Sequence, residues 1–154
     1  MEIVDKIAES NRIERIYRDP TPEEIAEYTR FLALKEVTIE ELQQFVDVYA
    51  PGKVLREWPG MNVFIGGRFL VGGPHVREEL QRLLDDINAG RIRPYEAHLA
   101  YEMIHPFQDG NGRSGRMLWY WMMEDRGHDT GLGFLHRFYY QALGAYELAI
   151  FGVR

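Results

Sequence analysis

Apolar residues recur at helical spacing along most of this 154-residue chain, and this periodicity constrains the fold more than any other feature of the sequence. Two of the periodic segments open on a capping-box pattern, in which Thr is followed three residues later by Glu, and a third is closed by Gly90, a helix stop signal. The expected helices begin at Thr21 and at Thr38, or run from Val76 to Ile87, Pro94 to Ile104, about Arg113 to Arg126 and Phe134 to Phe151. The pattern therefore predicts an all-α fold.

One segment, residues 61–71, breaks the helical rhythm. Two short runs of strand-forming residues, 63–65 and 68–71, flank the pair Gly66-Gly67. A Gly-Gly pair between two such runs is a typical hairpin connection. An isolated hairpin is only marginally stable, so we expect this one to lean on the helices.

The composition excludes several classes of protein. Apolar residues make up 45% of the chain, and the net charge is −6 with both signs interspersed. That balance disfavours a nucleic-acid binder, which would carry a basic stripe. There is no cysteine, which excludes disulfides and thiolate chemistry. The N-terminus lacks an apolar signal core, and the most apolar run, MLWYWMM, is too short to span a bilayer. We therefore expect a cytoplasmic protein with no membrane partner.

Residues 105–116, His-Pro-Phe-Gln-Asp-Gly-Asn-Gly-Arg-Ser-Gly-Arg, form the most unusual segment. Gly110, Asn111 and Gly112 all tolerate left-handed backbone, and such a turn can direct successive N–H groups at one anion. The N-terminus of the helix that follows adds more N–H groups and a positive dipole end. Arg113 and Arg116 would lie in its first turn, where the dipole disfavours cations. We therefore expect an anion between them, with a nucleotide polyphosphate as the natural candidate.

His105 and Asp109 flank the same turn. A His beside a phosphate site can act as a general base, and Asp109 offers a hard oxygen ligand suited to Mg²⁺ that is shared with phosphates. A zinc site is the competing interpretation, but zinc usually takes three or four protein ligands and the sequence has no clear set. His98 is interpreted as a packed or hydrogen-bonded histidine.

Residues 105–116 resemble the motif HPFx[D/E]GNGRxxR of the Fic family at every defined position, and the similarity extends over nearly the whole chain. The resemblance implies a single Fic domain over residues 1–154, with an all-α helical bundle and the hairpin at 61–71 as the family's flap. It also implies a protein adenylyltransferase, which transfers AMP from ATP to a Ser, Thr or Tyr hydroxyl of a target protein.

The resemblance also assigns roles to individual positions. His105 would deprotonate the target hydroxyl, and Asp109 would hold Mg²⁺ between the α- and β-phosphates of ATP. Those phosphates would be cradled by backbone N–H groups of Gly110, Asn111 and Gly112 and by the Asn111 side chain. The β-phosphate would contact Arg113 and the γ-phosphate Arg116.

Two neighbouring features complete this expectation. Phe107 is interpreted as an apolar anchor of the loop, and Pro106 as the residue that fixes the backbone just after the base. An extended segment of the target protein would add to the edge of the flap as an extra strand.

The N-terminal segment Ser10 to Arg15 resembles the inhibitory-helix motif [S/T]xxxE[G/N] found in many Fic proteins, within an expected helix at 1–18. Ser10 and Glu14 match the motif and share one helix face, whereas Arg15 stands where Gly or Asn is usual. The resemblance implies that Glu14 pairs with Arg116 and keeps the γ-phosphate from its productive place. Relief would come from a partner or from a change of oligomer, so a homo-oligomer is among the expected states.

Two alternatives stay open at this point. Some Fic relatives transfer UMP, GMP, a phosphate or phosphocholine, and the motif does not select the base. The chain could also be a nucleotide-binding regulator without turnover, although the intact His105 and Asp109 disfavour this. Removal of AMP from the product by the same site is a lesser possibility.

Overall fold

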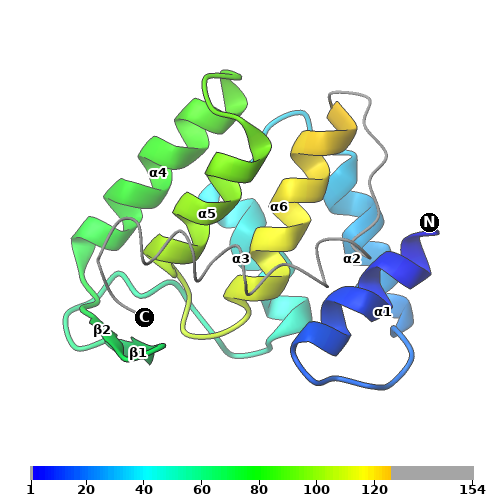
Figure 1. The fold of residues 1–154 in the computed structure, drawn as a ribbon, viewed down its shortest axis with the longest axis horizontal. Helices are drawn as coiled ribbons and strands as arrows, with labels where there is room; N and C mark the ends of the chain where they lie inside the picture. Colours follow the sequence, from blue (N-terminus) through cyan, green and yellow to red (C-terminus); the bar gives the residue numbers. More distant parts are fainter. Residues whose placement is uncertain (1, 126–154) are drawn as a thin grey trace.

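The computed structural model describes residues 2–125, which form six helices and one hairpin. Figure 1 shows their arrangement. In chain order they are α1 (Ile3–Ile13), α2 (Pro22–Leu32), α3 (Ile39–Tyr49), β1 (Val63–Ile65), β2 (Arg68–Leu70), α4 (Pro74–Asn88), α5 (Pro94–Ile104) and α6 (Asn111–Asp125). The expected helical fold with a small hairpin is confirmed. The helix expected at Phe134 to Phe151 lies outside the described residues.

The starts of α2 and α3 follow from the Thr residues that cap them. At α2 the capping box is complete, because the Thr21 hydroxyl accepts from the Glu24 N–H at 3.1 Å and the Glu24 carboxylate accepts from the Thr21 N–H at 2.9 Å. At α3 only half of the box forms. Thr38 accepts from the Glu41 N–H at 3.2 Å, but the Glu41 carboxylate is bonded to Arg30 of α2 instead. An ion pair between α2 and α3 has therefore replaced the second hydrogen bond of the capping box. The spacing of Thr and Glu in the sequence does not predict this pair.

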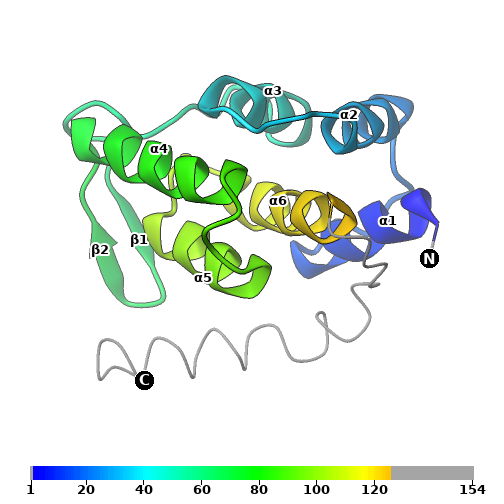
Figure 2. The same ribbon diagram turned by 90° about the horizontal axis from the view of Figure 1, so that it is seen from above.

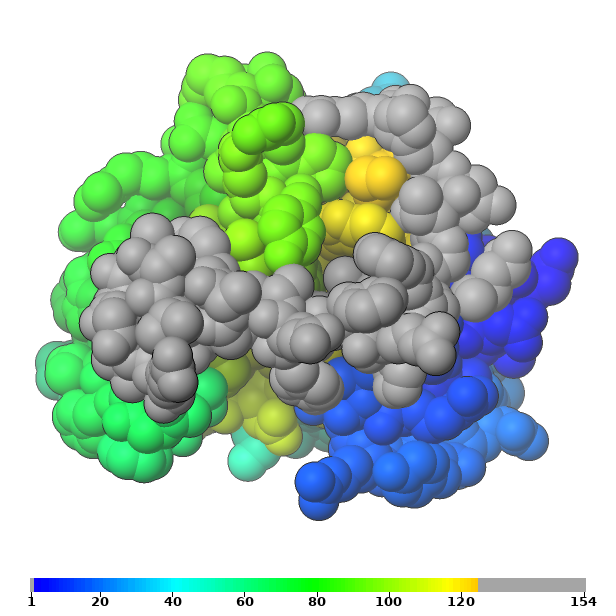
Figure 3. All heavy atoms as spheres, viewed as in Figure 1, coloured from blue at the N-terminus to red at the C-terminus, as the bar shows by residue number. Residues whose placement is uncertain are grey.

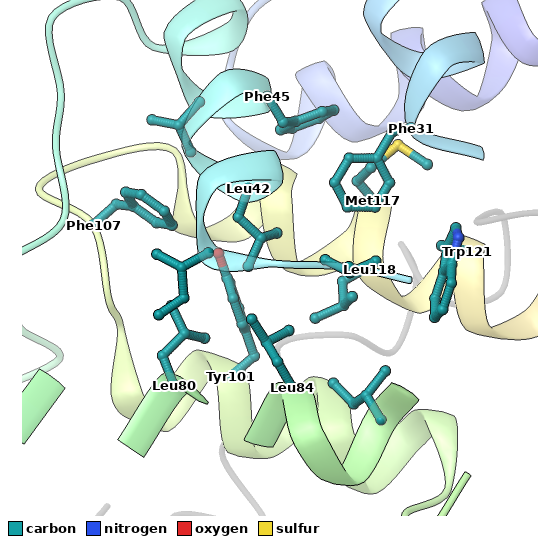
Figure 4. Close-up of a cluster of buried hydrophobic side chains, with 14 of the residues drawn as sticks. Phe31, Leu42, Phe45, Leu80, Leu84, Tyr101, Phe107, Met117, Leu118 and Trp121 are labelled. Carbon is teal, nitrogen blue, oxygen red and sulfur yellow. The ribbon is translucent and has the colours of Figure 1, made fainter. Parts of the chain in front are cut away.

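The helices pack around α6. Figure 2 shows α2 and α3 in one layer and α5 on the other side of α6; α6 contacts α1, α2, α3 and α5. The apolar faces meet in one core, seen in Figure 4, whose labelled side chains come from α2, α3, α4, α5, the loop before α6 and α6 itself. Phe31, Leu42, Leu80 and Tyr101 are fully buried there. Each such side chain contributes roughly 1.5–3 kcal/mol of burial free energy.

The hairpin projects from one edge of this bundle, at the lower left in Figures 1 and 3. Val63 pairs with Leu70, and Phe64 with Phe69, so that the two strands are antiparallel and joined by Gly66-Gly67. Both glycines have positive φ, 53° and 81°, as the predicted two-residue turn requires. The two Phe side chains on one face are 70% and 61% exposed, whereas Val63, Ile65, Arg68 and Leu70 on the other face are half-buried. The hairpin therefore leans on the helices with one face, as expected.

Within residues 2–125, no helix combines the length and the apolar character needed to cross a membrane.

Candidate active site

Residues 105–116 connect α5 to α6 and begin with a strained histidine. His105 ends α5 in the left-handed conformation, with φ 49° and ψ 61°, and its N–H donates to the Tyr101 carbonyl at 3.0 Å. Phe107 follows and is fully buried, and its backbone bridges to Leu55. The expectation that Phe107 anchors the loop in the core is confirmed.

The turn between Phe107 and α6 is closed by Asn111. Its side-chain oxygen accepts from the Phe107 N–H, and its side-chain nitrogen donates to the Phe107 carbonyl, both at 2.8 Å. Gly110 has φ 82°, a left-handed conformation that favours glycine. The amide of Asn111 therefore shapes the loop, so the backbone N–H is the group of this residue that the fold leaves for an anion.

The first turn of α6 carries the features of an anion site. The helix begins at Asn111, two residues earlier than the sequence pattern predicts, because the Ser114 N–H already donates to the Gly110 carbonyl at 2.9 Å. The N–H groups of Asn111, Gly112 and Arg113 come before this first intrahelical bond, at the positive end of the helix dipole. The first turn contains no acidic residue.

The two arginines of the motif are buried beside that turn. Arg113 is 7% exposed, and one of its terminal nitrogens donates to the Tyr49 carbonyl. Burial lowers the pKa of Arg113 from its ordinary value. Arg116 is 1% exposed. Two buried cations at a helix N-terminus are mutually unfavourable unless negative charge lies close to them.

In this structure the negative charge comes from α1. Arg116 Nε donates to the Ser10 hydroxyl at 2.8 Å, and Nη2 donates to the Ser10 carbonyl at 3.0 Å and to Glu14 Oε1 at 2.7 Å. A Cβ atom built on Gly112 would lie 2.2 Å from Glu14 Oε1 and 3.0 Å from Arg116 Nη1. The Glu14 carboxylate therefore lies directly against the first turn of α6. The structure brings together Ser10, Glu14 and Arg116, as the sequence motif predicts.

The segment around Glu14 is held by contacts of residues that are not defined positions of the inhibitory-helix motif. Asn11 is fully buried and its side chain donates to Glu24 of α2 at 3.0 Å. Glu14 itself ends α1, and Arg15 follows with φ 60°, while the Ile16 N–H donates back to the Asn11 carbonyl at 3.0 Å. This is the left-handed helix ending that usually selects Gly or Asn. Arg15 therefore departs from the motif in residue type, while its backbone keeps the left-handed conformation that Gly or Asn would adopt.

The electrostatic environment keeps His105 neutral. Burial, followed by the charges of Arg56 and Arg68, lowers the pKa of His105 to about 4, against a hydrogen bond to the Glu102 backbone and the charge of Asp109. At neutral pH the imidazole therefore has a free lone pair and can accept a proton.

His98 lies in a different environment on the same helix. It is 2% exposed and its Nδ1–H donates to the Gly115 carbonyl at 3.1 Å, while burial lowers the pKa of this group to about 4. The interpretation of His98 as a packed, hydrogen-bonded residue is confirmed.

Asp109 lies at the exposed outer side of the loop. Its Oδ1 accepts from the Gly110 N–H at 2.8 Å. No group of three or more His, Cys, Asp or Glu side chains that could hold a metal ion occurs among residues 2–125. A single carboxylate fits Mg²⁺, which is commonly bound by one or two carboxylates together with substrate phosphates.

Sequence reasoning missed Arg56 and Tyr49. Both contact the motif from segments far away in the chain, Arg56 through the His105 carbonyl and Tyr49 through Arg113. A charged residue between Leu55 and Glu57 carries no local signal of burial, so only the folded chain identifies Arg56.

Comparison with known families gives a match that covers the motif loop. Residues 28–123 match the Fic/DOC family, a span that runs from within α2 into α6 and includes the hairpin and the motif loop but not Ser10 or Glu14. A search of curated proteins gave no match. Because the matched span covers well over half of the chain and contains the complete motif, the chain belongs to the Fic/DOC family.

Proposed function

We propose that this protein transfers AMP from ATP to a hydroxyl side chain of a target protein. The Fic/DOC family consists of transferases of nucleotide-derived groups to proteins. The observation that carries the finer proposal is the placement of a neutral His105 across the motif turn from an anion site at the start of α6.

The neutral imidazole supports the role of general base. In the proposed reaction the target oxygen attacks the α-phosphorus, its proton goes to His105, and the bond from the α-phosphorus to the bridging oxygen of the β-phosphate breaks. Pyrophosphate is the leaving group. The neutral imidazole has a lone pair that can accept this proton, although burial makes it a weaker base than a histidine whose pKa lies near the working pH.

The anion site supports binding of the polyphosphate. N–H groups of Gly112 and Arg113, the two buried guanidinium groups and the positive end of α6 would offset the charge of ATP. Asp109 would hold Mg²⁺, which when bound neutralises charge on the polyphosphate. Placement of the leaving group is the main requirement of such a transfer.

The flap, residues 61–71, is the proposed docking site for the target. Within residues 2–125 its two strands form an isolated hairpin in which each strand has one partner, and an outer edge of this kind can accept an added strand. Main-chain pairing would bring one hydroxyl side chain of the target toward His105.

Glu14 is proposed as an internal inhibitor of the same site. Its carboxylate is bonded to Arg116 and touches Gly112, where the γ-phosphate is expected. A rate loss of about 100-fold follows from a misplacement of ~1 Å, so Glu14 need not prevent binding of ATP. A protein partner or a change of oligomer would release α1.

The proposal is tested with Glu14→Gly protein, Mg²⁺ and ATP that carries its label on either the α- or the γ-phosphate. AMP transfer predicts α-label on protein, including the enzyme itself, at a rate about 10-fold or more above wild type. The matched control combines Glu14→Gly with His105→Asn and should show no transfer. Label from the γ-phosphate alone would indicate phosphate transfer, and binding of ATP without either label would indicate a regulator. Competition by UTP or GTP reports the base preference.

A further inference from the structure

Arg56 is a buried cation without a carboxylate in hydrogen-bond contact among the residues described. Its exposed fraction is 1%, and burial lowers the pKa of its guanidinium group from the ordinary value. A buried charge of this kind is unfavourable unless its hydrogen-bonding groups are well satisfied. Folded domains are only marginally stable, so the presence of a buried charge at this position needs a structural explanation.

The guanidinium group is satisfied by four backbone carbonyls from two separate parts of the chain. Nε donates to His105 O at 2.8 Å and Nη2 to Ile104 O at 3.1 Å. Nη1 donates to Met61 O at 3.0 Å and to Leu70 O at 3.3 Å. The first two carbonyls end α5, and the other two belong to the two ends of the hairpin.

The main chain of Arg56 reinforces both connections. Its N–H donates to the Pro106 carbonyl at 2.8 Å, and its carbonyl accepts from the Gly73 N–H at 2.9 Å. A Cβ atom on Gly72 would lie 2.3 Å from Met61 O, so the base of the hairpin is tightly closed where Arg56 enters. The end of α5 and the hairpin lie side by side in both Figure 1 and Figure 2.

We propose that Arg56 is the positioning residue that holds the flap and the catalytic histidine in one fixed relation. Its guanidinium group donates to the carbonyl of His105, which has the left-handed conformation, and to carbonyls at both ends of the flap. A target strand paired with the flap would then present its hydroxyl at a set distance from the imidazole. Arg56 touches neither ATP nor the target, so it acts through the two elements that do.

The geometry requires arginine rather than any cation. One planar fork reaches the end of α5 with Nε and Nη2 and the flap with Nη1. The single nitrogen of lysine cannot reproduce these separate directions, although it keeps the charge. Loss of the fork should therefore affect alignment of the target more than binding of ATP, whose site lies at the start of α6.

The test uses Arg56→Lys and Arg56→Met in the Glu14→Gly protein and rests on the proposed function for its kinetic part. Both variants should lower kcat by about 10–100-fold, as expected for misalignment of ~1 Å or less. The KM for ATP should change by less than about 3-fold, because Arg113, Arg116 and the α6 turn are untouched. Arg30→Lys, which loses comparable bonds to Glu27 and Glu41 on α2 and α3, is the matched control and should leave kcat and KM unchanged.

A second readout does not need activity. Amide hydrogen exchange should speed up at residues 61–71 and 104–107 in Arg56→Lys and stay unchanged in α2, since the substitution removes side-chain bonds to the flap and to the end of α5 and none to α2. Unchanged exchange at the flap, or an unchanged kcat in folded Arg56→Lys, would overturn the proposal. If Arg56→Met does not fold, Arg56→Lys decides the question. If the Glu14→Gly parent transfers no AMP, the proposed function fails, whereas the exchange experiment still tests Arg56.

Discussion

His105 combines two properties that are uncommon for a residue other than Gly or Asn at the end of a helix. It takes the left-handed backbone conformation, which costs roughly 1–2 kcal/mol for a residue other than glycine. It is also neutral, because burial lowers the pKa of its imidazole to about 4. Such strain tends to persist at functional sites, where the surrounding structure enforces it. Here two features hold His105 in this conformation: Phe107 is buried in the core, and Arg56 Nε donates a hydrogen bond to the His105 carbonyl.

At the residue scale we predict that His105→Ala and His105→Asn both abolish transfer by the Glu14→Gly protein, by about 10²–10⁴-fold. Asn tolerates the left-handed backbone, so it keeps the shape of the loop while it removes the base. ATP affinity, measured by calorimetry, should stay unchanged in both variants. An NMR titration should show two imidazole signals with midpoints near pH 4, from His98 and His105, and only the His105 signal should disappear in either variant. Transfer at the parent rate by His105→Asn would contradict the assignment.

At the element scale, the end of α1 determines how firmly Glu14 is held. Ser10 and Glu14 both bond Arg116, and the helix ends immediately afterwards at Arg15 with φ 60°. Glycine reaches this conformation without steric cost, and arginine does not. The docked end of α1 is therefore less stable than it would be with the residue usual in the motif, by about 1 kcal/mol.

We therefore predict that Arg15→Gly in the otherwise wild-type protein lowers the rate of AMP transfer by about 5-fold, since 1 kcal/mol corresponds to that factor. The matched control is Arg15→Ala, which removes the same charge but keeps a Cβ atom, and which should leave the rate close to wild type. Initial rates of autolabelling at one ATP concentration measure the effect. Equal rates for the Gly and Ala variants would show that the backbone at residue 15 has no influence on inhibition.

At the scale of the whole molecule, α1 is part of the core rather than an appendage. Ile7 and Ile13 are buried, and Lys6 lies 5.0 Å from the centre of the Tyr120 ring of α6 while pairing with Glu124 at 3.6 Å. The family match begins only at residue 28, yet the helix before it completes the packing around α6. One element therefore contributes to stability and would also carry the proposed inhibition.

We predict that deletion of residues 1–16 destabilises the domain, in contrast to Glu14→Gly. The deletion exposes the surface that Ile7 and Ile13 cover, at roughly 1.5–3 kcal/mol for each side chain, a substantial part of a typical domain stability of about 5–15 kcal/mol. Glu14→Gly also removes the carboxylate bonded to buried Arg116, but it leaves this apolar burial in place, so its effect should be the smaller of the two. Urea unfolding followed by circular dichroism should give a clearly lower midpoint for the deletion than for Glu14→Gly. Equal midpoints would show that α1 is dispensable for folding.

The sequence by itself determined the helices and the hairpin of residues 2–125 and the family to which the chain belongs. Helical periodicity, the cap at Thr21 and the Gly66-Gly67 turn are local signals, because propensity and hydrogen bonding between near neighbours decide them. The residue types of the motif likewise predict anion binding with a neighbouring base, and this stays a prediction. The spacing of Ser10 and Glu14 placed both side chains on one face of α1.

Only the tertiary structure decided which distant groups meet. The bonds from α1 to Arg116 and from Tyr49 to Arg113 join parts of the chain separated by many residues. The lowered pKa of His105 arises first from burial, which no local pattern encodes. Arg56 is the clearest case, since its role comes entirely from four carbonyls on α5 and the hairpin. Long-range contacts depend on how all the apolar faces pack at once, and that is settled by the fold as a whole.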